Sequence, residues 1–536
     1  MCRICSEWLG IIGSESVSVQ KNIIIQIFTD ITFNLLKNGA AKQNRNSAGE
    51  MEKRRTFMES IWSATCEIEK REPLREDCKA EAVVIGAGMA GILTAYELQK
   101  AGTDVIVLDA GRIAGGQTRN TTAKITSQHG LIYWKLASIF GRKKAAQYAA
   151  ANQEAITSYR RLIQEEKIDC DFETQDAFFY SQDRASLKAE AKAASELGIP
   201  ASFTEDIDLP AVSAGAVRFE DQAQFHPLKF IRAVSDKLTV YENTPVYRVE
   251  KAEKNPDAKN APVLGESCLK IGGGFTVRAK HVVFACHFPF INFPGLYFAR
   301  MYQERSYVLA LKNARQPEGM FLGDGEDGYS LRNYGDILLF GGGKHRTGKN
   351  AGGRYELLRK KASEWFPGCE EIAHWSAQDG MTTDGVPYIG RYSSAKPDGG
   401  SKAANWYAAA GFQKWGMTSS MVSAKILSDY ICGRKNPYAD VVSPHRFSLA
   451  DIPSLLSNSA QAAGGTAKRI FGTPEVSVDE VLPGQGKIAR ADGKKRGVYV
   501  DEKGKKYFSE IKCTHLGCGV EWNPDEKSWD LSLIHI

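Results

Sequence analysis

The stretch EAVVIGAGMAGILTAYELQKAGTDVIVLD at residues 81–109 decides the fold. It begins with a short apolar run, 81–85, whose composition is typical of a buried parallel strand. Residues 92–100 have the composition of a helix, and Gly102 predicts where that helix ends. A second strand-like run comes next and finishes on a carboxylate at Asp109. We therefore predict a strand–helix–strand unit with two parallel strands.

The first turn of this unit carries the pattern G-x-G-x-x-G. Gly86 allows the tight turn, Gly88 lets the backbone approach a pyrophosphate, and Gly91 allows close packing of helix on strand. The helix N-terminus offers free N–H groups and a partial positive charge to phosphates. Asp109 follows Gly91 by 18 residues, where it can accept a hydrogen bond from a ribose hydroxyl. Glycine-rich turns are common, but with strands, helix and acid all in register we predict a dinucleotide site.

The composition is that of an ordinary soluble chain. Of 536 residues, 43% are hydrophobic and 25% charged, which allows several domains with full cores. The net charge of +6 is small and the basic residues are scattered, so we expect no nucleic-acid partner. No uninterrupted apolar run reaches about 18 residues, so we expect no membrane span. The 11 cysteines lie mostly alone, which favours a reducing, cytoplasmic location.

Shifts in composition divide the chain. We expect residues 1–57 to be an N-terminal extension, non-native or disordered, because their composition differs from that of the rest of the chain. Short alternating apolar runs between 306 and 343 predict an antiparallel sheet, and we place a substrate subdomain mainly at 170–215 and 300–375. A linker rich in Ser, Ala and Gly is expected at 446–475.

Two later motifs carry a family resemblance. The chain reads TTDGVPYIG at 382–390 and GFQKWGM at 411–417, where a helix begins. With the N-terminal unit, these motifs resemble the FAD-dependent amine and amino-acid oxidoreductases of the D-amino-acid oxidase-like superfamily. There the first unit holds the ADP half of FAD and the late motifs close over the flavin ring. The resemblance implies FAD at 58–445 and an α/β fold, with a Rossmann-like FAD-binding domain interleaved with an antiparallel-sheet substrate domain.

The resemblance also implies which residues contact the cofactor. The helix N-terminus near Gly416 would place a positive dipole beside the flavin N1–C2 edge. The loop at 110–124 could wrap the ribityl and diphosphate groups, or it could be a polar surface loop. Singly, the matched glycines could be packing or capping residues, but as an ordered set they favour the cofactor. The matched positions are Gly86, Gly88, Gly91, Asp109 and Val246 on the ADP side, and Gly385, Gly411, Phe412, Gly416, Met417 and Thr418 on the ring side.

For catalysis, the resemblance implies hydride transfer from a carbon bearing an amine to flavin N5, which depends on positioning and desolvation. Arg332 matches a position where relatives often carry an arginine facing the substrate, and it could hold a carboxylate. A structural arginine is the equal alternative. We expect His226 and His287 to be packing or capping residues. Weaker cavity candidates are Tyr334, Lys344, His345 and Trp375.

The tail is predicted to be a partial all-β domain at 476–530. The motif CTHLGC at 513–518 resembles the first cluster-binding loop of a Rieske [2Fe–2S] domain. The resemblance implies Cys513 and His515 as metal ligands, with another Cys and His required from a second loop. That loop, of the form C-P-C-H-G, should come at once, but residues 531–536 read LSLIHI. We therefore expect a truncated or wrongly assembled end and no [2Fe–2S] cluster in this chain.

The implied function is oxidation of a C–N bond in an amine or amino acid by hydride transfer to FAD, with electrons passed to a Rieske cluster in the complete protein. One alternative is an FAD enzyme acting on a C–C or C–OH bond. Another is an electron-transfer flavoprotein module without a substrate of its own. A closed cavity of amino-acid size beside the flavin ring would argue against that module. Neither the substrate nor the electron acceptor can be deduced from the sequence.

Overall fold

The computed structural model describes most of the chain from Glu59 onward. The predicted extension at 1–57, the segment 531–536 and most of the predicted linker lie outside the described residues. Within the described part, no helix is both long and apolar enough to cross a lipid bilayer. The described residues are 59–251, 266–291, 295–325, 328–349, 352–392, 405–446, 457, 476–491, 493–511 and 520–530.

The predicted strand–helix–strand unit is confirmed. It consists of strand β1 (Cys78–Ile85), helix α4 (Met89–Lys100) and strand β2 (Val105–Leu108). The two strands pair in parallel, with Ile85 opposite Leu108. All four residues of β2 and the last four of β1 are buried, as expected for strands covered on both faces.

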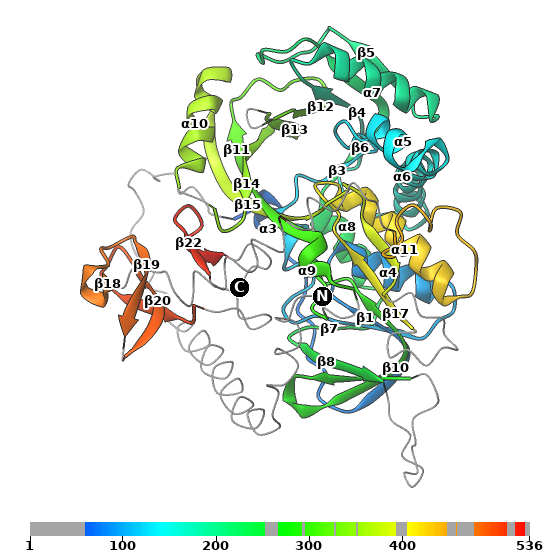
Figure 1. Cartoon of the computed structure of the whole chain (residues 1–536), viewed down its shortest axis with the longest axis vertical. Coiled ribbons are helices and arrows are strands. Elements are labelled where there is room, and N and C mark those ends of the chain that lie inside the picture. The colour runs from blue at the N-terminus through cyan, green and yellow to red at the C-terminus, as the bar shows by residue number, and fades with distance from the viewer. Residues whose placement is uncertain are drawn as a thin grey trace, which may run out of the picture. The chain divides into compact units, whose positions relative to one another are not determined.

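An eight-stranded sheet forms around this unit (Figure 1). Its other strands are β7 (Val240–Tyr241), β8 (Val246–Lys251), β9 (Ser267–Ile271), β10 (Thr276–Phe284), β16 (Tyr388–Arg391) and β17 (Trp406–Ala410). The order is β16-β17-β10-β1-β2-β7, and β9 and β8 extend it as antiparallel strands beside β10. Helix α11 (Gly416–Ile431) packs against α4 beside this sheet. The sheet thus brings the first and the last motif of the sequence together.

The second large sheet confirms the predicted antiparallel architecture. Its order is β15-β11-β14-β13-β12-β4-β6-β3, and β5 pairs with β6. Within this sheet, the described strands pair antiparallel except for β4 and β12, which pair in parallel. The strands are β3 (Lys124–Ile125), β4 (Glu173–Tyr180), β5 (Ala201–Thr204), β6 (Ala216–Gln224), β11 (Met301–Lys312), β12 (Met320–Gly323), β13 (Ser330–Tyr334), β14 (Ile337–Arg346) and β15 (Glu370–Thr382).

Strand β11 is longer than the sequence predicts. Its residues alternate between buried and partly buried positions at the N-terminal end. Two of the buried positions, Gln303 and Arg305, are polar. Polar residues at buried positions conceal the period of two by which a half-buried strand is recognised.

Helices flank the two sheets. They are α3 (Ile61–Thr65), α5 (Tyr133–Phe140), α6 (Arg142–Glu165), α7 (Arg184–Glu196), α8 (Pro227–Ser235), α9 (Tyr297–Arg300) and α10 (Arg354–Trp365). At the start of α8, Nδ1 of His226 accepts a hydrogen bond from the Lys229 N–H at 3.2 Å. The capping role expected for His226 is therefore confirmed.

The C-terminal residues form two small sheets. One contains β18 (Val476–Ser477), β19 (Gly486–Ala491), β20 (Lys494–Val500) and β21 (Lys506–Ser509), and the other is the hairpin of β22 (Glu521–Asn523) and β23 (Ser528–Asp530). Two glycines make room for the hairpin tryptophans. A Cβ on Gly486 would lie 2.1 Å from the Trp522 ring, and one on Gly497 would lie 2.7 Å from the Trp529 ring. We call strands β18–β23 the C-terminal β module.

Candidate functional site

A cavity of about 430 Å³ lies at the carboxyl ends of the parallel strands β1, β2 and β10. It continues along β15 and β17 to the first turn of α11. Open parallel sheets bind their ligands at this edge, outside the carboxyl ends of the strands. We call it the first cavity.

Two glycines of the first turn, Gly86 and Gly88, line this cavity. Gly86 has a φ of +108°, and a Cβ there would lie 2.5 Å from the carbonyl oxygen of Ala285. A Cβ on Gly91 would lie 1.8 Å from the carbonyl oxygen of Gly86. Gly88 is the N-cap of α4 and lines the cavity directly. Gly86 and Gly91 therefore shape the turn, and Gly88 leaves room for a ligand at the helix N-terminus.

Asp109 and Val246 also line the first cavity. The Asp109 carboxylate accepts hydrogen bonds from the N–H groups of Ala87 and Gly111, each at 2.7 Å. Burial raises the pKa of Asp109, and the two backbone N–H groups oppose that rise. Each carboxylate oxygen has further acceptor capacity, so a ribose hydroxyl could still donate to it.

The loop before β3 forms another wall of the first cavity. Thr118 Oγ1 accepts a hydrogen bond from the Met89 N–H at 3.0 Å, and Gln117 Oε1 accepts one from the Gln378 N–H at 2.7 Å. These bonds tie the loop to α4 and to β15. Sequence reasoning did not single out either side chain, because hydroxyls and amides are common in loops. The residues of this loop that line the first cavity are Ala110, Gly115, Gly116, Gln117, Thr118 and Thr121.

The residues assigned to the ring side fall into two groups. Gly385 lines neither of the two large cavities; it has a φ of +86° in a turn beside the 2.6 Å ion pair of Asp384 and Arg446. Thr418 also lies outside them, and its hydroxyl donates to the Thr126 carbonyl at 3.2 Å. These two positions support the surrounding loops, and their contact with the flavin stays a prediction. The ring-side residues that do line the first cavity are Gly411, Phe412, Gly416 and Met417.

A second cavity of about 340 Å³ adjoins the first on the side of the antiparallel sheet. Strands β11, β12 and β14 contribute to its wall, and so does the first turn of α11. The shared wall means that a molecule in the second cavity lies next to the α11 end of the first. The residues that line both cavities are Thr121, Ala377, Asp379, Lys414, Gly416 and Met417.

Lys414 is a charged residue where the two cavities meet. Its Nζ lies 3.0 Å from Asp379 and 3.6 Å from Glu304, and it donates to Ser306 Oγ at 2.9 Å. Burial alone would lower the pKa of Lys414, but the two carboxylates raise it above its usual value. Lys414 is therefore a compensated cation. It went unnoticed in the sequence because its partners lie on distant strands.

Lys124 is a cation of a different kind in the wall of the second cavity. Its Nζ donates to the Phe321 carbonyl at 2.6 Å and to Ser330 Oγ at 2.8 Å. Both partners are neutral, and no carboxylate among the described residues forms an ion pair with this lysine. Burial, and then the nearby Arg332 guanidinium, lower the pKa of Lys124 to about 7. In the sequence, Lys124 is distinguished only as the end of a loop.

Arg332 does not face either cavity, which corrects the prediction that it holds a substrate carboxylate. Its side chain is buried, and Nη1 donates to three carbonyls, those of Thr122 at 2.8 Å, Ala123 at 3.0 Å and Phe225 at 3.1 Å. The guanidinium also lies 5.2 Å from the centre of the Trp62 ring. It thus has the structural role that was the alternative for this residue.

Of the residues that the sequence indicates as weaker cavity candidates, some line a cavity and others do not. Lys344 lines the second cavity. His287, expected to be a packing or capping residue, lines the first cavity, with Nε2 3.0 Å from Gln303 Oε1. The candidates that line neither cavity are Tyr334, His345 and Trp375.

The predicted metal ligands Cys513 and His515 lie outside the described residues. Within the described ranges, no group of three or more His, Cys, Asp or Glu side chains is arranged to hold a metal ion.

Comparison with known families now defines the class of protein. Residues 81–430 match the model of the DAO family, described as FAD dependent oxidoreductase. The match covers more than half of the chain, and both of its cofactor motifs lie within it. The chain belongs to this family, and it is an FAD-dependent oxidoreductase.

The chain is also similar to individual proteins, one in sequence and two in fold. The chain is 36% identical over 489 residues to the Bacillus subtilis protein named "Putative Rieske 2Fe-2S iron-sulfur protein YhfW", covering 88% of this chain and 92% of that one. Glycine oxidase from Geobacillus kaustophilus has a similar fold, with a TM-score of 0.54 at 17% identity, over 69% of this chain and 99% of that one. An L-amino acid deaminase from Proteus vulgaris has a TM-score of 0.54 at 18% identity, over 71% of this chain and 97% of that one.

Proposed function

We propose that this enzyme oxidises the C–N bond of an amino acid, with FAD as the electron acceptor. The observation that carries the proposal is the second cavity, which adjoins the first and contains the ammonium of Lys124 without a carboxylate partner among the described residues. The names of relatives with a similar fold, glycine oxidase and L-amino acid deaminase, support the same substrate class.

The argument from Lys124 is electrostatic. Placing a cation in a partly desolvated wall is unfavourable unless an anion compensates it. Its two hydrogen-bond partners are neutral, so the substrate can supply the missing charge. An α-carboxylate at Nζ would form a charge-assisted hydrogen bond and orient the amine-bearing carbon relative to the shared wall. We therefore assign to Lys124 the role that the family resemblance implied for Arg332.

The residues of the first cavity fit FAD. Gly88 and the N-terminus of α4 would hold the diphosphate, and Asp109 would accept from the ribose. Bound FAD would supply the two-electron acceptor that no amino-acid side chain provides. At the shared wall, Lys414 and the N-terminus of α11 would favour negative charge that develops on the ring.

We further propose that the reduced flavin passes its electrons to a Rieske cluster. Support comes from the name of the Bacillus subtilis relative and from Cys513 and His515, which supply one cysteine and one histidine of the required set. The electron acceptor is thus proposed to be a one-electron centre.

The test compares amino acids with their decarboxylated amines. Each compound is added anaerobically to the purified flavoprotein, and bleaching of the oxidised-flavin band is followed. We expect at least one amino acid to bleach the flavin quickly and its matched amine to do so much more slowly. Equal rates for the pair would rule out carboxylate recognition. No bleaching by any amino acid, with full bleaching by dithionite, would favour a different substrate class or an electron-transfer module.

A further inference from the structure

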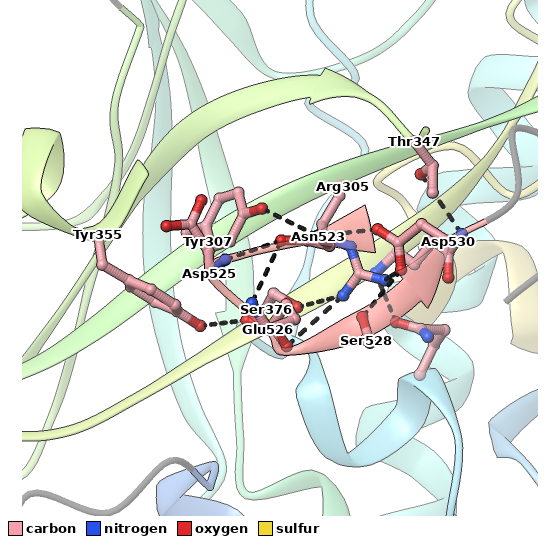
Figure 2. A network of polar contacts seen from close by, with 12 residues as sticks. Arg305, Tyr307, Thr347, Tyr355, Ser376, Asn523, Asp525, Glu526, Ser528 and Asp530 are labelled. Carbon is pink, nitrogen blue, oxygen red and sulfur yellow. Dashed lines mark hydrogen bonds and ion pairs between the residues drawn. The ribbon is translucent and has the colours of Figure 1, made fainter. Parts of the chain in front are cut away.

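The hairpin β22–β23 contacts the antiparallel sheet through a buried charge cluster (Figure 2). Arg305 of β11 forms an ion pair with Asp530 at 3.0 Å, and the side chains are only 5% and 2% exposed. Arg305 also lies 3.5 Å from Glu526 and donates to Ser376 Oγ at 2.7 Å. A guanidinium buried to this degree requires carboxylates nearby. Here both carboxylates belong to the hairpin, far from β11 in the sequence.

The hairpin itself holds the Asp530 carboxylate in place. Asn523 Nδ2 donates to one oxygen at 2.8 Å, and Ser528 Oγ donates to the other at 3.0 Å. The side-chain oxygen of Asn523 accepts from the N–H groups of Asp525 at 3.1 Å and Glu526 at 3.2 Å, which fixes the turn. These hydrogen bonds hold the carboxylate in the orientation in which it pairs with Arg305.

A second contact joins the same turn to helix α10. The Asp525 carboxylate accepts from the N–H groups of Gly353 at 3.0 Å and Arg354 at 3.3 Å, at the start of the helix. Glu526 accepts from the Tyr355 hydroxyl at 2.6 Å. Carboxylates at a helix N-terminus satisfy free N–H groups and interact favourably with the helix dipole. The turn therefore caps α10 as well as neutralising Arg305.

Strand β11 contacts both the hairpin and the wall of the two cavities. Side chains of successive strand residues point to opposite faces. Arg305 contacts the hairpin, whereas its neighbours Glu304 and Ser306 contact Lys414, at 3.6 Å and 2.9 Å. Lys414 lines both cavities. One short piece of strand thus joins the C-terminal hairpin to the cation at the shared wall.

We propose that docking of the C-terminal β module onto Arg305 positions the cavity wall of β11 and Lys414, so that the module is needed for productive substrate binding. Without the hairpin, Arg305 loses the Asp530 and Glu526 carboxylates and α10 loses its cap. The strand would then shift or loosen, and Lys414 with it. Asp530 and Arg305 are positioning residues in this scheme. The inference rests on the proposed function only for the measurement of KM and kcat, which needs an amino-acid substrate.

The test uses the full chain with Asp530→Asn, which removes the carboxylate charge that lies 3.0 Å from Arg305. The exposed Glu502→Gln is the matched control, since Glu502 is 70% exposed and pairs with Lys527 at 3.5 Å. Hydrogen exchange is measured at 520–530, at the start of α10 and at 304–308, and KM and kcat are measured with an amino acid that bleaches the flavin. In Asp530→Asn we expect faster hydrogen exchange in all three segments. We also expect KM to rise by about 2- to 30-fold while kcat is largely kept, because energetic coupling between distant positions usually has this magnitude. Flavin content should not change.

Two further variants keep the proposal falsifiable if Asp530→Asn folds poorly. Tyr355→Phe removes one contact to Glu526 and should raise exchange in the same segments by less. The double variant Arg305→Met with Asp530→Leu removes both charges of the 3.0 Å ion pair and leaves Glu526 hydrogen-bonded to Tyr355, so it should protect 520–530 better than Asp530→Asn. If hydrogen exchange at 520–530 in Asp530→Asn equals that of the control, the claim that Asp530 docks the module onto Arg305 is wrong. If exchange is raised but KM is unchanged, the claim that docking positions the cavity wall is wrong. Because exchange needs no substrate, the docking result stands even if amino-acid oxidation fails.

Discussion

Lys124 decides how this enzyme should respond to pH. With a pKa of about 7, it loses its proton near neutrality, and only the ammonium form attracts a carboxylate. We therefore expect kcat/KM for an amino acid to fall as the pH rises through about 7, because this parameter reports the free enzyme. Profiles of kcat/KM against pH for the wild type and for Lys124→Met provide the measurement. The variant should lose this alkaline fall and about 2 kcal/mol or more of transition-state binding. The same fall in the variant would show that another group titrates.

Gly88 decides whether the cofactor fits. A Cβ at this position would already lie 3.2 Å from Thr118 Oγ1, and a larger side chain would enter the first cavity. Gly88→Val should therefore abolish FAD binding, as measured by flavin released on denaturation. Ala101→Val, at the exposed end of α4, should keep its FAD and serves as the control. A folded Gly88→Val protein with stoichiometric FAD would place the cofactor elsewhere.

At the scale of elements, the TTDGVPYIG motif stabilises a turn between β15 and β16. Asp384 and Arg446 form a 2.6 Å ion pair in which both side chains are 3% exposed. Arg446 donates further to the Pro387 carbonyl at 2.7 Å, and Asp384 accepts from the Val386 N–H at 3.0 Å. The buried ion pair therefore joins the motif to the segment after α11.

Removing one partner of this pair should cost much stability. We expect Asp384→Asn to lower the free energy of unfolding by about 3–5 kcal/mol, because the buried Arg446 guanidinium loses the carboxylate that lies 2.6 Å from it. Asp429→Asn, which breaks the more exposed pair of Asp429 and Arg434, should cost about 1 kcal/mol or less, because these side chains are 23% and 51% exposed. Denaturant titration of both variants measures the difference. Similar losses in the two would mean that the buried pair is not what holds the turn.

Elements were predictable where the sequence pattern is local. The parallel strands β1 and β2 are short apolar runs, and α4 lies between two glycine signals, so each could be read from its own residues. β11 could not be read completely, because buried Gln303 and Arg305 interrupt its apolar pattern and find their partners only in the folded chain. A sequence motif also does not indicate whether each of its residues points toward a cavity or away from it in the folded chain. For this reason the motifs alone assign Gly385 and Thr418 to the flavin, although both residues lie outside the two cavities.

At the scale of the whole molecule, the cofactor site was more predictable than the substrate site. The residues proposed to hold the diphosphate lie together in one strand–helix–strand unit. The second cavity combines Lys124 with strands that lie about 200 residues later, next to Phe321 and Ser330. Arg332 is of the residue type expected for a carboxylate contact, but backbone carbonyls already occupy it. Whether Lys124 or Arg332 lines the second cavity depends on the pairing of strands that are distant in the sequence, and no local pattern encodes that pairing.

The central claim is that the two adjoining cavities form one amino-acid-oxidising flavin site. The most direct measurement follows flavin absorbance in the purified enzyme under anaerobic conditions while an amino acid is added, with the wild type and Lys124→Met side by side. The account predicts stoichiometric FAD in both proteins, rapid bleaching in the wild type and slow bleaching in the variant, with equal bleaching of both by dithionite. An amino acid that bleaches both proteins at the same rate would contradict the account.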